Sequence, residues 1–220
     1  MALIPLRSWD DLQKGDIINI PISDAVECQE KIIRKWEPQS EVSAFKYGGP
    51  IISSAATLSS LFINSMFRRK LKLRNHGRLL SMLSLTTSSY LLTNVLHNEW
   101  VEKKIMLYSF KCPLCLETRA SSIVNFCGIV YPLLMAPTLN LALAGGIGLR
   151  VPHITEVREL SKFWWSVVKP GVTHITTLFI ANSVIASQVT NQQILSMETV
   201  RNVLLRIEDY RREYEIKPSE

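Results

Sequence analysis

The sequence predicts an all-α, polytopic membrane protein with four transmembrane helices. Charged residues make up 20% of the 220-residue chain, yet four long stretches contain no Asp, Glu, Lys or Arg. About 20 helical residues, each rising about 1.5 Å, cross a hydrocarbon core of about 30 Å. A soluble helix of that length would carry a charged face. The predicted spans are about residues 48–67, 79–98, 120–149 and 170–193, in a transmembrane domain of residues 48–197.

A buried core of a soluble all-α protein is the alternative interpretation of the composition. Apolar residues make up 47% of the chain and the mean hydropathy is +0.12, near the top of the soluble range. The position of the charges decides against it, because they are concentrated in the tails and short loops. The excess of positive charge lies next to the spans, where it attracts anionic headgroups. We therefore expect a lipid bilayer with anionic lipids as partner, and no nucleic acid.

The N-terminal segment, residues 1–47, mixes acidic and basic side chains without an uninterrupted apolar run. It has neither the pattern of a secretory signal peptide nor that of a mitochondrial presequence, so we expect the spans themselves to direct insertion. Asp24 and Glu27 have capping-box spacing at the start of a short amphipathic helix. This helix either lies on the membrane surface or a partner, or belongs to a solvated linker. Its apolar patch consists of Ile32, Ile33 and Trp36.

The loop between the first two spans carries six positive charges and no acidic residue. By the positive-inside rule, such a loop lies on the cytoplasmic or matrix side of the membrane. The loop of residues 150–169 agrees, and by alternation both tails and the loop of residues 99–119 lie on the opposite side. The residues expected to set topology and contact lipid are Arg68, Arg69, Lys70, Lys72, Arg74 and Arg78. The expected interfacial aromatic anchors are Trp100, Trp164 and Trp165.

The composition of the spans favours contacts between helices. The second span is rich in Ser and Thr, which hydrogen-bond between helices in membranes. The third span is long for a straight perpendicular helix and contains Pro132 and Pro137, so we expect a kinked or broken helix. Small residues four positions apart allow another helix to approach closely. These pairs are Ala142/Gly146 and Ala144/Gly148 in the third span, and Ser53/Thr57 and Ala56/Ser60 in the first.

No catalytic, cofactor-binding or metal-binding pattern is apparent, so we expect no enzyme, cofactor or small-molecule substrate. With no charged residue inside any predicted span, a proton-coupled transporter is not expected. Cys112 and Cys115 form a C-x-x-C motif, but zinc would need two more ligands and a thioredoxin-like enzyme a β-α-β context. Three interpretations stay open: a disulfide closing the loop, two reduced thiols without chemistry, and a metal or redox role.

Charged residues return after Met197, and residues 196–220 are predicted to form a separate amphipathic charged helix. Ser196 is placed to cap its start, and Glu208 and Arg212 form an i,i+4 pair on its polar face. The opposite, apolar face is suited to the membrane interface or a partner protein. Its partner-facing residues are Val200, Val203, Leu204 and Ile207.

Several short motifs follow one another in a distinctive order and spacing. They are Asn64-Ser-Met-Phe67-Arg68-Arg69, Cys112-x-x-Cys115-x-x-Thr118-Arg119, Val130-Tyr131-Pro132, the Ala-Gly run before Arg150, Pro152-His153, and Trp165 with Lys169-Pro170. Together these motifs resemble the transmembrane protein 126 family over roughly residues 48–186. The cysteine pair followed by Thr-Arg makes the chain more similar to the A-type members.

This resemblance implies a non-enzymatic protein of the mitochondrial inner membrane that acts in the assembly of respiratory complex I. The implied partners are membrane-arm subunits of complex I, bound when newly inserted, and other complex I assembly factors. Two alternatives follow from the residues alone. One is a small inner-membrane translocase or solute pathway, based on the kinked third span and polar lining. The other is a redox relay through Cys112 and Cys115.

Overall fold

The computed structural model describes residues 21–73, 76–146 and 157–216, and every regular element in these residues is a helix. Four continuous helical segments in this part of the chain are long and apolar enough to cross a membrane. The predicted all-α, four-span architecture is therefore confirmed. The predictions for Arg74 and Gly148 lie outside the described residues.

Two of the four spans are composed of several consecutive helical elements. The second span consists of α4, the π-helix η1 and α5, and the third of α6, the π-helix η2 and α7. In chain order the elements are α2 (Ile22–Lys35), α3 (Ser43–Lys70), α4 (Arg78–His97), η1 (Asn98–Glu102), α5 (Lys103–Met106), α6 (Pro113–Asn125), η2 (Phe126–Val130), α7 (Tyr131–Gly146) and α8 (Val157–Ile216).

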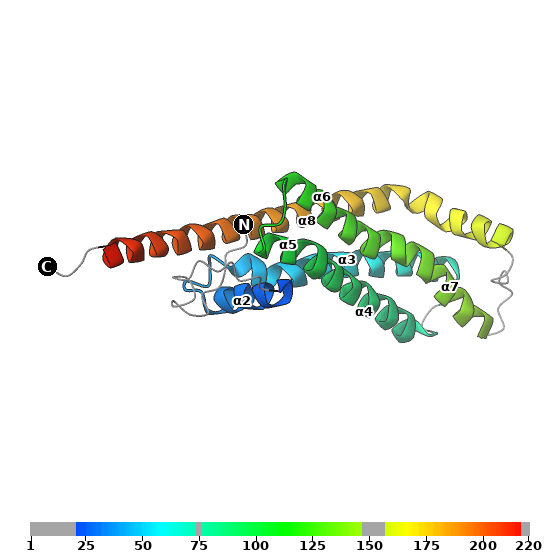
Figure 1. Ribbon diagram of the computed structural model, residues 1–220. Coiled ribbons are helices and arrows are strands. Elements are labelled where there is room, and N and C mark those ends of the chain that lie inside the picture. Colours follow the sequence, from blue (N-terminus) through cyan, green and yellow to red (C-terminus); the bar gives the residue numbers. More distant parts are fainter. Residues whose placement is uncertain (1–20, 74–75, 147–156, 217–220) are drawn as a thin grey trace.

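Helix α3 is central to the bundle, because it contacts α4, α8 and the η2 and α7 parts of the third span. Helix α8 also packs along α6 (Figure 1). With 60 residues, α8 is about 90 Å long, roughly three times the thickness of a hydrocarbon core. Its C-terminal part projects beyond the other spans, at the end of the bundle where α2 lies (Figure 1).

Two clusters of buried apolar side chains hold the helices together. The first joins α2, α3, the η1–α5 segment, α6 and the C-terminal half of α8. The second joins α3, α4, η2, α7 and the N-terminal part of α8. Fully buried members include Ile52, Ala56, Val101, Ile105, Val124 and Met197 in the first cluster, and Ile63, Phe67 and Ala136 in the second.

At Gly128 in η2, the third span packs directly against the backbone of the first span. A Cβ atom at this position would lie 2.8 Å from the Cα and 3.1 Å from the carbonyl oxygen of Ala56. Ala56 and Ser60 are fully buried, so this predicted small-residue pair does allow close packing. Ala142 and Gly146 are exposed, and among the described residues no atom lies within 4 Å of a Cβ built on Gly146, so close packing at this pair stays a prediction. Ala144, by contrast, is buried.

The prolines of the third span do not break it, because helical structure continues from Pro113 to Gly146. Pro132 is the second residue of α7, two positions after the π-helix η2 ends at Val130, and Pro137 lies further inside α7. A π-bulge and a proline are both known causes of helix kinks. The kink at Pro132 and Pro137 stays a prediction, while a broken helix is wrong.

Three predictions about helix ends were wrong. The predicted loop of residues 99–119 is mostly helical, because the second span continues to Met106 and α6 already begins at Pro113. Ser196 does not begin a new helix, since α8 runs through it; the chain has neither Gly nor Pro between residues 172 and 216 to end a helix there. Residue Pro21 precedes α2, without a side-chain cap, and Glu27 forms an ion pair with Lys31 at 2.7 Å instead of a capping box.

Tyr108 fixes the connection between α5 and α6 to α8. Its hydroxyl donates to the carbonyl oxygen of Met197 at 2.5 Å, and the Arg201 guanidinium lies 5.2 Å from its ring centroid. Burial raises the pKa of Tyr108 to about 12, so the donor keeps its proton at neutral pH.

We expect Tyr108→Phe to lower the free energy of unfolding by about 1 kcal/mol, the net contribution of one such hydrogen bond. Thermal denaturation of the purified variant and wild-type protein in mild detergent measures this loss of stability. Tyr210→Phe is the control, because Tyr210 is exposed on the projecting part of α8. Equal melting temperatures for the two variants would contradict the expected role of Tyr108.

Candidate functional site

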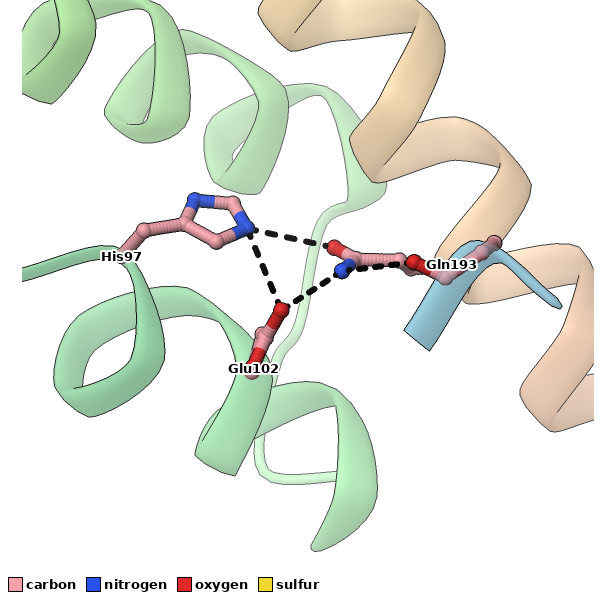
Figure 2. Close-up of polar contacts among 4 residues, drawn as sticks. His97, Glu102 and Gln193 are labelled. Atoms are coloured by element: carbon pink, nitrogen blue, oxygen red, sulfur yellow. Dashed lines mark hydrogen bonds and ion pairs between the residues drawn. The ribbon is translucent and has the colours of Figure 1, made fainter. Parts of the chain in front are cut away.

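A buried polar cluster connects the second and fourth spans (Figure 2). Gln193 of α8 donates through Nε2 to Glu102 Oε1 at 2.8 Å and to the Ala44 carbonyl oxygen at 3.3 Å. Its Oε1 lies 3.3 Å from His97 Nε2, which also lies 3.7 Å from Glu102 Oε1. His97 and Gln193 are fully buried, and only 13% of the Glu102 side chain is exposed. We call these three residues the His97–Glu102–Gln193 cluster.

The contacts determine which nitrogen of His97 carries a proton. His97 Nε2 faces two oxygen atoms, so it is the donor in the neutral ring. The other ring nitrogen, Nδ1, is buried and has no hydrogen-bond partner in the part of the chain that the structure describes. In the same residues, no group of three or more His, Cys, Asp or Glu side chains could hold a metal ion. The hydrogen bonds of Gln193 to His97 and Glu102 connect the second and fourth spans.

Two adjacent glycines allow α3 to approach the cluster. A Cβ at Gly48 would lie 2.7 Å from Gln193 Nε2, and a Cβ at Gly49 would lie 3.1 Å from Asn94 Oδ1. A larger residue at Gly48 or Gly49 would displace the side-chain amide of Gln193 or Asn94, respectively. The start of α3 thus fits against the polar side chains of two other spans.

Sequence reasoning missed Glu102, because the second span was expected to end at residue 98. In the structure the second span extends to Met106 and includes Glu102, so the expectation that no span contains an acidic residue is wrong. The five-residue separation of His97 and Glu102 falls on the π-helix η1, which has a wider turn than an α-helix. The available signal was the apolar residues Val101, Ile105 and Met106, which continue beyond the first charges and are buried.

Gln193→Leu should cost about 2 kcal/mol of stability, because it leaves Glu102 and His97 buried without their shared partner. Thermal denaturation in detergent and protein abundance in membranes measure the effect. The matched control is Gln192→Leu, since Gln192 is the neighbouring glutamine and is exposed. If the two variants are equally stable, the cluster is not a structural tie.

Arg68 was expected to contact lipid, and this prediction was wrong. The side chain is buried, with 5% exposed, and it donates to the His76 carbonyl oxygen at 2.8 Å and to Ser81 Oγ at 2.9 Å. It also lies 3.5 Å from the Gly77 carbonyl oxygen and from Asn140 Oδ1. Arg68 therefore closes the hairpin between the first two spans and connects it to α7. The exposed residues Arg69, Lys70, Lys72 and Arg78 remain predicted lipid contacts.

Further polar pairs inside the bundle involve amide side chains. Asn140 donates to Asn64 Oδ1 at 2.8 Å, and Asn182 donates to Ser59 Oγ at 3.0 Å. Each pair joins α3 to another span. At these two places, polar side chains of different spans therefore hydrogen-bond to one another.

The predicted partner-facing residues of the C-terminal segment have different environments. Val200 is fully buried in the first apolar cluster and Leu204 packs against it, so partner contact is wrong for Val200. Val203 and Ile207 are exposed and line an open groove with Ile32 and Trp36 of the α2 region.

The predicted interfacial anchors also differ in exposure. The rings of Trp100 and Trp165 are more than half exposed, so an anchoring role stays a prediction for them. Trp164 is half-buried instead, and its Nε1 donates to the Leu133 carbonyl oxygen at 3.0 Å. It thereby connects α8 to α7.

Cys112 and Cys115 are free thiols in the structure, so the disulfide is not formed there. Hydrogen bonds from Cys115 hold the pKa of Cys112 below its ordinary value. Cys112 immediately precedes the first turn of α6. The three interpretations of the C-x-x-C motif therefore stay predictions.

The second and fourth spans bury a smaller share of their residues than the first and third spans do. Only 22% and 17% of the residues in their most apolar parts are buried, against 44% in each of the first and third spans. Large exposed apolar side chains are Leu79, Leu80, Leu83, Leu91 and Val95 on α4, and Phe179, Ile180, Val184 and Leu195 on α8.

Four apolar helices held together by buried polar pairs define a multi-pass helical membrane protein. The family model for transmembrane protein 126 matches residues 24–205, and the chain therefore belongs to this family. It is 30% identical over 190 residues to the transmembrane protein 126 of Drosophila melanogaster, covering 85% of each chain. It is 27% identical over 191 residues to transmembrane protein 126A of Mus musculus, covering 86% of this chain and 88% of the relative. No solved structure matches the chain.

Proposed function

We propose that this protein is a non-enzymatic assembly factor for the membrane arm of mitochondrial respiratory complex I. It lies in the inner membrane, binds newly inserted hydrophobic subunits through its transmembrane helices, and acts together with other complex I assembly factors. The observation that carries the proposal is the set of exposed apolar side chains on the second and fourth spans, combined with hydrogen-bonded polar pairs between spans in the interior.

The interior pairing favours a scaffold over a solute pathway. A pathway needs polar groups that face a water-filled route, whereas Asn64, Asn140 and Gln193 hydrogen-bond to side chains of neighbouring helices. A scaffold instead needs a stable bundle whose outer helix faces accept other helices. The exposed faces of α4 and α8 are available for such contacts.

The length of α8 also supports the proposal. The helix continues beyond the charge-free stretch as a charged segment that carries an ion pair between Glu208 and Arg212. This segment extends outside the hydrocarbon core, where soluble or peripheral assembly factors are accessible. One helix thus presents both a membrane surface and an aqueous surface.

Affinity purification of the tagged protein in mild detergent tests the proposal. We expect enrichment of complex I membrane-arm subunits and other assembly factors. Complexome profiling should place the chain in an intermediate smaller than complete complex I. Copurification of only unrelated membrane carriers would contradict the assembly role.

Orientation is tested separately, with a tag in the loop between Arg68 and Arg78. The positive charges of this loop predict that it faces the matrix, so the tag should resist protease in mitoplasts. A tag that is cleaved in intact mitoplasts would contradict this orientation. The four-span architecture does not depend on the result.

A further inference from the structure

An open groove of about 780 Å³ runs along the outer surface between α6 and α8. More than half of the residues that line it are polar, although both helices belong to membrane spans. The residues that matter here are Glu117, Ser121, Ser122 and Asn125 from α6, and Ser183 and Ser187 from α8.

Most hydroxyl groups in this groove are already satisfied by the helices that carry them. Ser122 donates to the Thr118 carbonyl oxygen, and Ser183 to that of Phe179, each at 2.8 Å. Ser121 reaches across to the Ser183 carbonyl oxygen at 3.3 Å. These small side chains leave room for a third helix to approach closely.

Two groups in the groove that can accept hydrogen bonds, the Glu117 carboxylate and the Asn125 side-chain oxygen, have capacity for further partners. Glu117 accepts a hydrogen bond from Ser187, but among the described residues no cation lies within ion-pairing distance of it. Asn125 uses its amide NH2 group to bind the Ser121 carbonyl oxygen and Ser183 Oγ, at 3.0 and 2.9 Å. Its Oδ1 atom has no partner in the described part of the chain, although the side chain is 95% buried, with a relative exposure of 5%.

We propose that this groove binds a transmembrane helix of a partner membrane protein that carries a Lys or Arg facing Glu117 and a hydroxyl or amide donor facing Asn125. A lipid acyl chain supplies neither a positive charge for Glu117 nor a hydrogen-bond donor for Asn125, whereas a helix of another protein can supply both. Glu117 and Asn125 are eight residues apart, or about 12 Å along the helix. The matching groups on the partner are therefore expected about seven or eight residues apart on one face.

This inference rests on the proposed function and deepens it, because it states which helix face holds a subunit and which chemistry the subunit provides. The test uses the full-length chain in its native membrane. A photoreactive amino acid, p-benzoylphenylalanine, replaces Ser122 in the groove. The control places it at Ser84, an exposed hydroxyl position on α4. Mass spectrometry identifies each adduct.

We expect the Ser122 probe to crosslink to a membrane-spanning segment of another protein. Glu117→Lys should lower the yield of this adduct about ten-fold, since it turns an attraction into a repulsion. Changing the facing Lys or Arg of the identified partner to Glu should restore the yield. Glu198→Lys is the matched control, an exposed acidic residue on α8 outside the groove, and should leave the yield unchanged. If Glu117→Lys does not accumulate, Glu117→Gln keeps an acceptor for Ser187 and should still lower the yield.

The outcomes separate this inference from the proposed function. An adduct only with lipid, or only with a second copy of this chain, overturns the inference even if complex I subunits copurify. An adduct with another protein that is insensitive to the charge at position 117 also overturns it. A charge-dependent, rescued adduct with a protein outside complex I supports the inference and contradicts the proposed assembly role.

Discussion

Gly128→Val is expected to cost more than about 3 kcal/mol of stability and to remove most of the protein from the membrane. The first atom of the new side chain would lie 2.8 Å from the Cα of Ala56, well inside contact distance. Because the obstructing atoms belong to the backbone, no side-chain rotation relieves the clash. The first and third spans must therefore move apart, and the packing of both apolar clusters is lost along α3.

Protein abundance in isolated membranes and the melting temperature in detergent measure this effect. The matched control is Gly145→Val in the same span, where no atom of the residues that the structure describes lies within 4 Å of an added Cβ. We expect this variant to accumulate like the wild-type protein. Comparable losses for both variants would show that a β-branched residue in the helix, and not the contact with Ala56, lowers stability.

Arg68→Met should cost about 3 kcal/mol, because it removes the charged donor that binds the carbonyl oxygens of the hairpin. The His76 carbonyl oxygen and Ser81 Oγ would lose contacts of 2.8 and 2.9 Å, and the connection to Asn140 would be lost as well. We expect lower abundance and a lower melting temperature. Combined neutralisation of Arg68, Arg69, Lys70 and Lys72 should destabilise the hairpin chiefly through Arg68.

Arg69→Met is the control for this prediction. Arg69 is adjacent to Arg68 in sequence but is exposed, so its replacement does not disturb the buried contacts of the hairpin. The other positive charges of the loop remain and keep it on its side of the membrane. We expect wild-type abundance and topology for this variant. If Arg69→Met is as harmful as Arg68→Met, the total charge of the loop matters more than the buried hydrogen bonds.

The spans were predictable because the hydrocarbon core excludes charges, so charge-free stretches mark where a helix crosses it. The helix ends were not predictable by the same rule. Once a helix leaves the core, charged residues no longer oppose it, and only a Gly, a Pro or a lost contact ends it. The second span therefore continues through Glu102 to Met106, and α8 continues through Ser196 to Ile216.

The buried contacts could be predicted only in part. The pair Ala56/Ser60 follows a pattern of small residues within one helix, but its partner Gly128 is a single glycine 72 positions away and matches no such pattern. The pair Ala142/Gly146 has the pattern and yet is exposed within this chain. Arg68 likewise contacts Asn140 from another span, and the loop sequence does not indicate this contact.

The unbroken helix α8 connects the membrane-embedded and aqueous parts of the protein as one continuous rod, so the two parts move together. Its residues 198–216 extend about 28 Å beyond the charge-free stretch, so a 10° tilt of the helix would displace its tip by about 5 Å. Helices in membranes tilt in response to their neighbours and to bilayer thickness. The arrival or departure of a helix beside α8 would thus be transmitted mechanically across the membrane surface, without a hinge or a change in secondary structure.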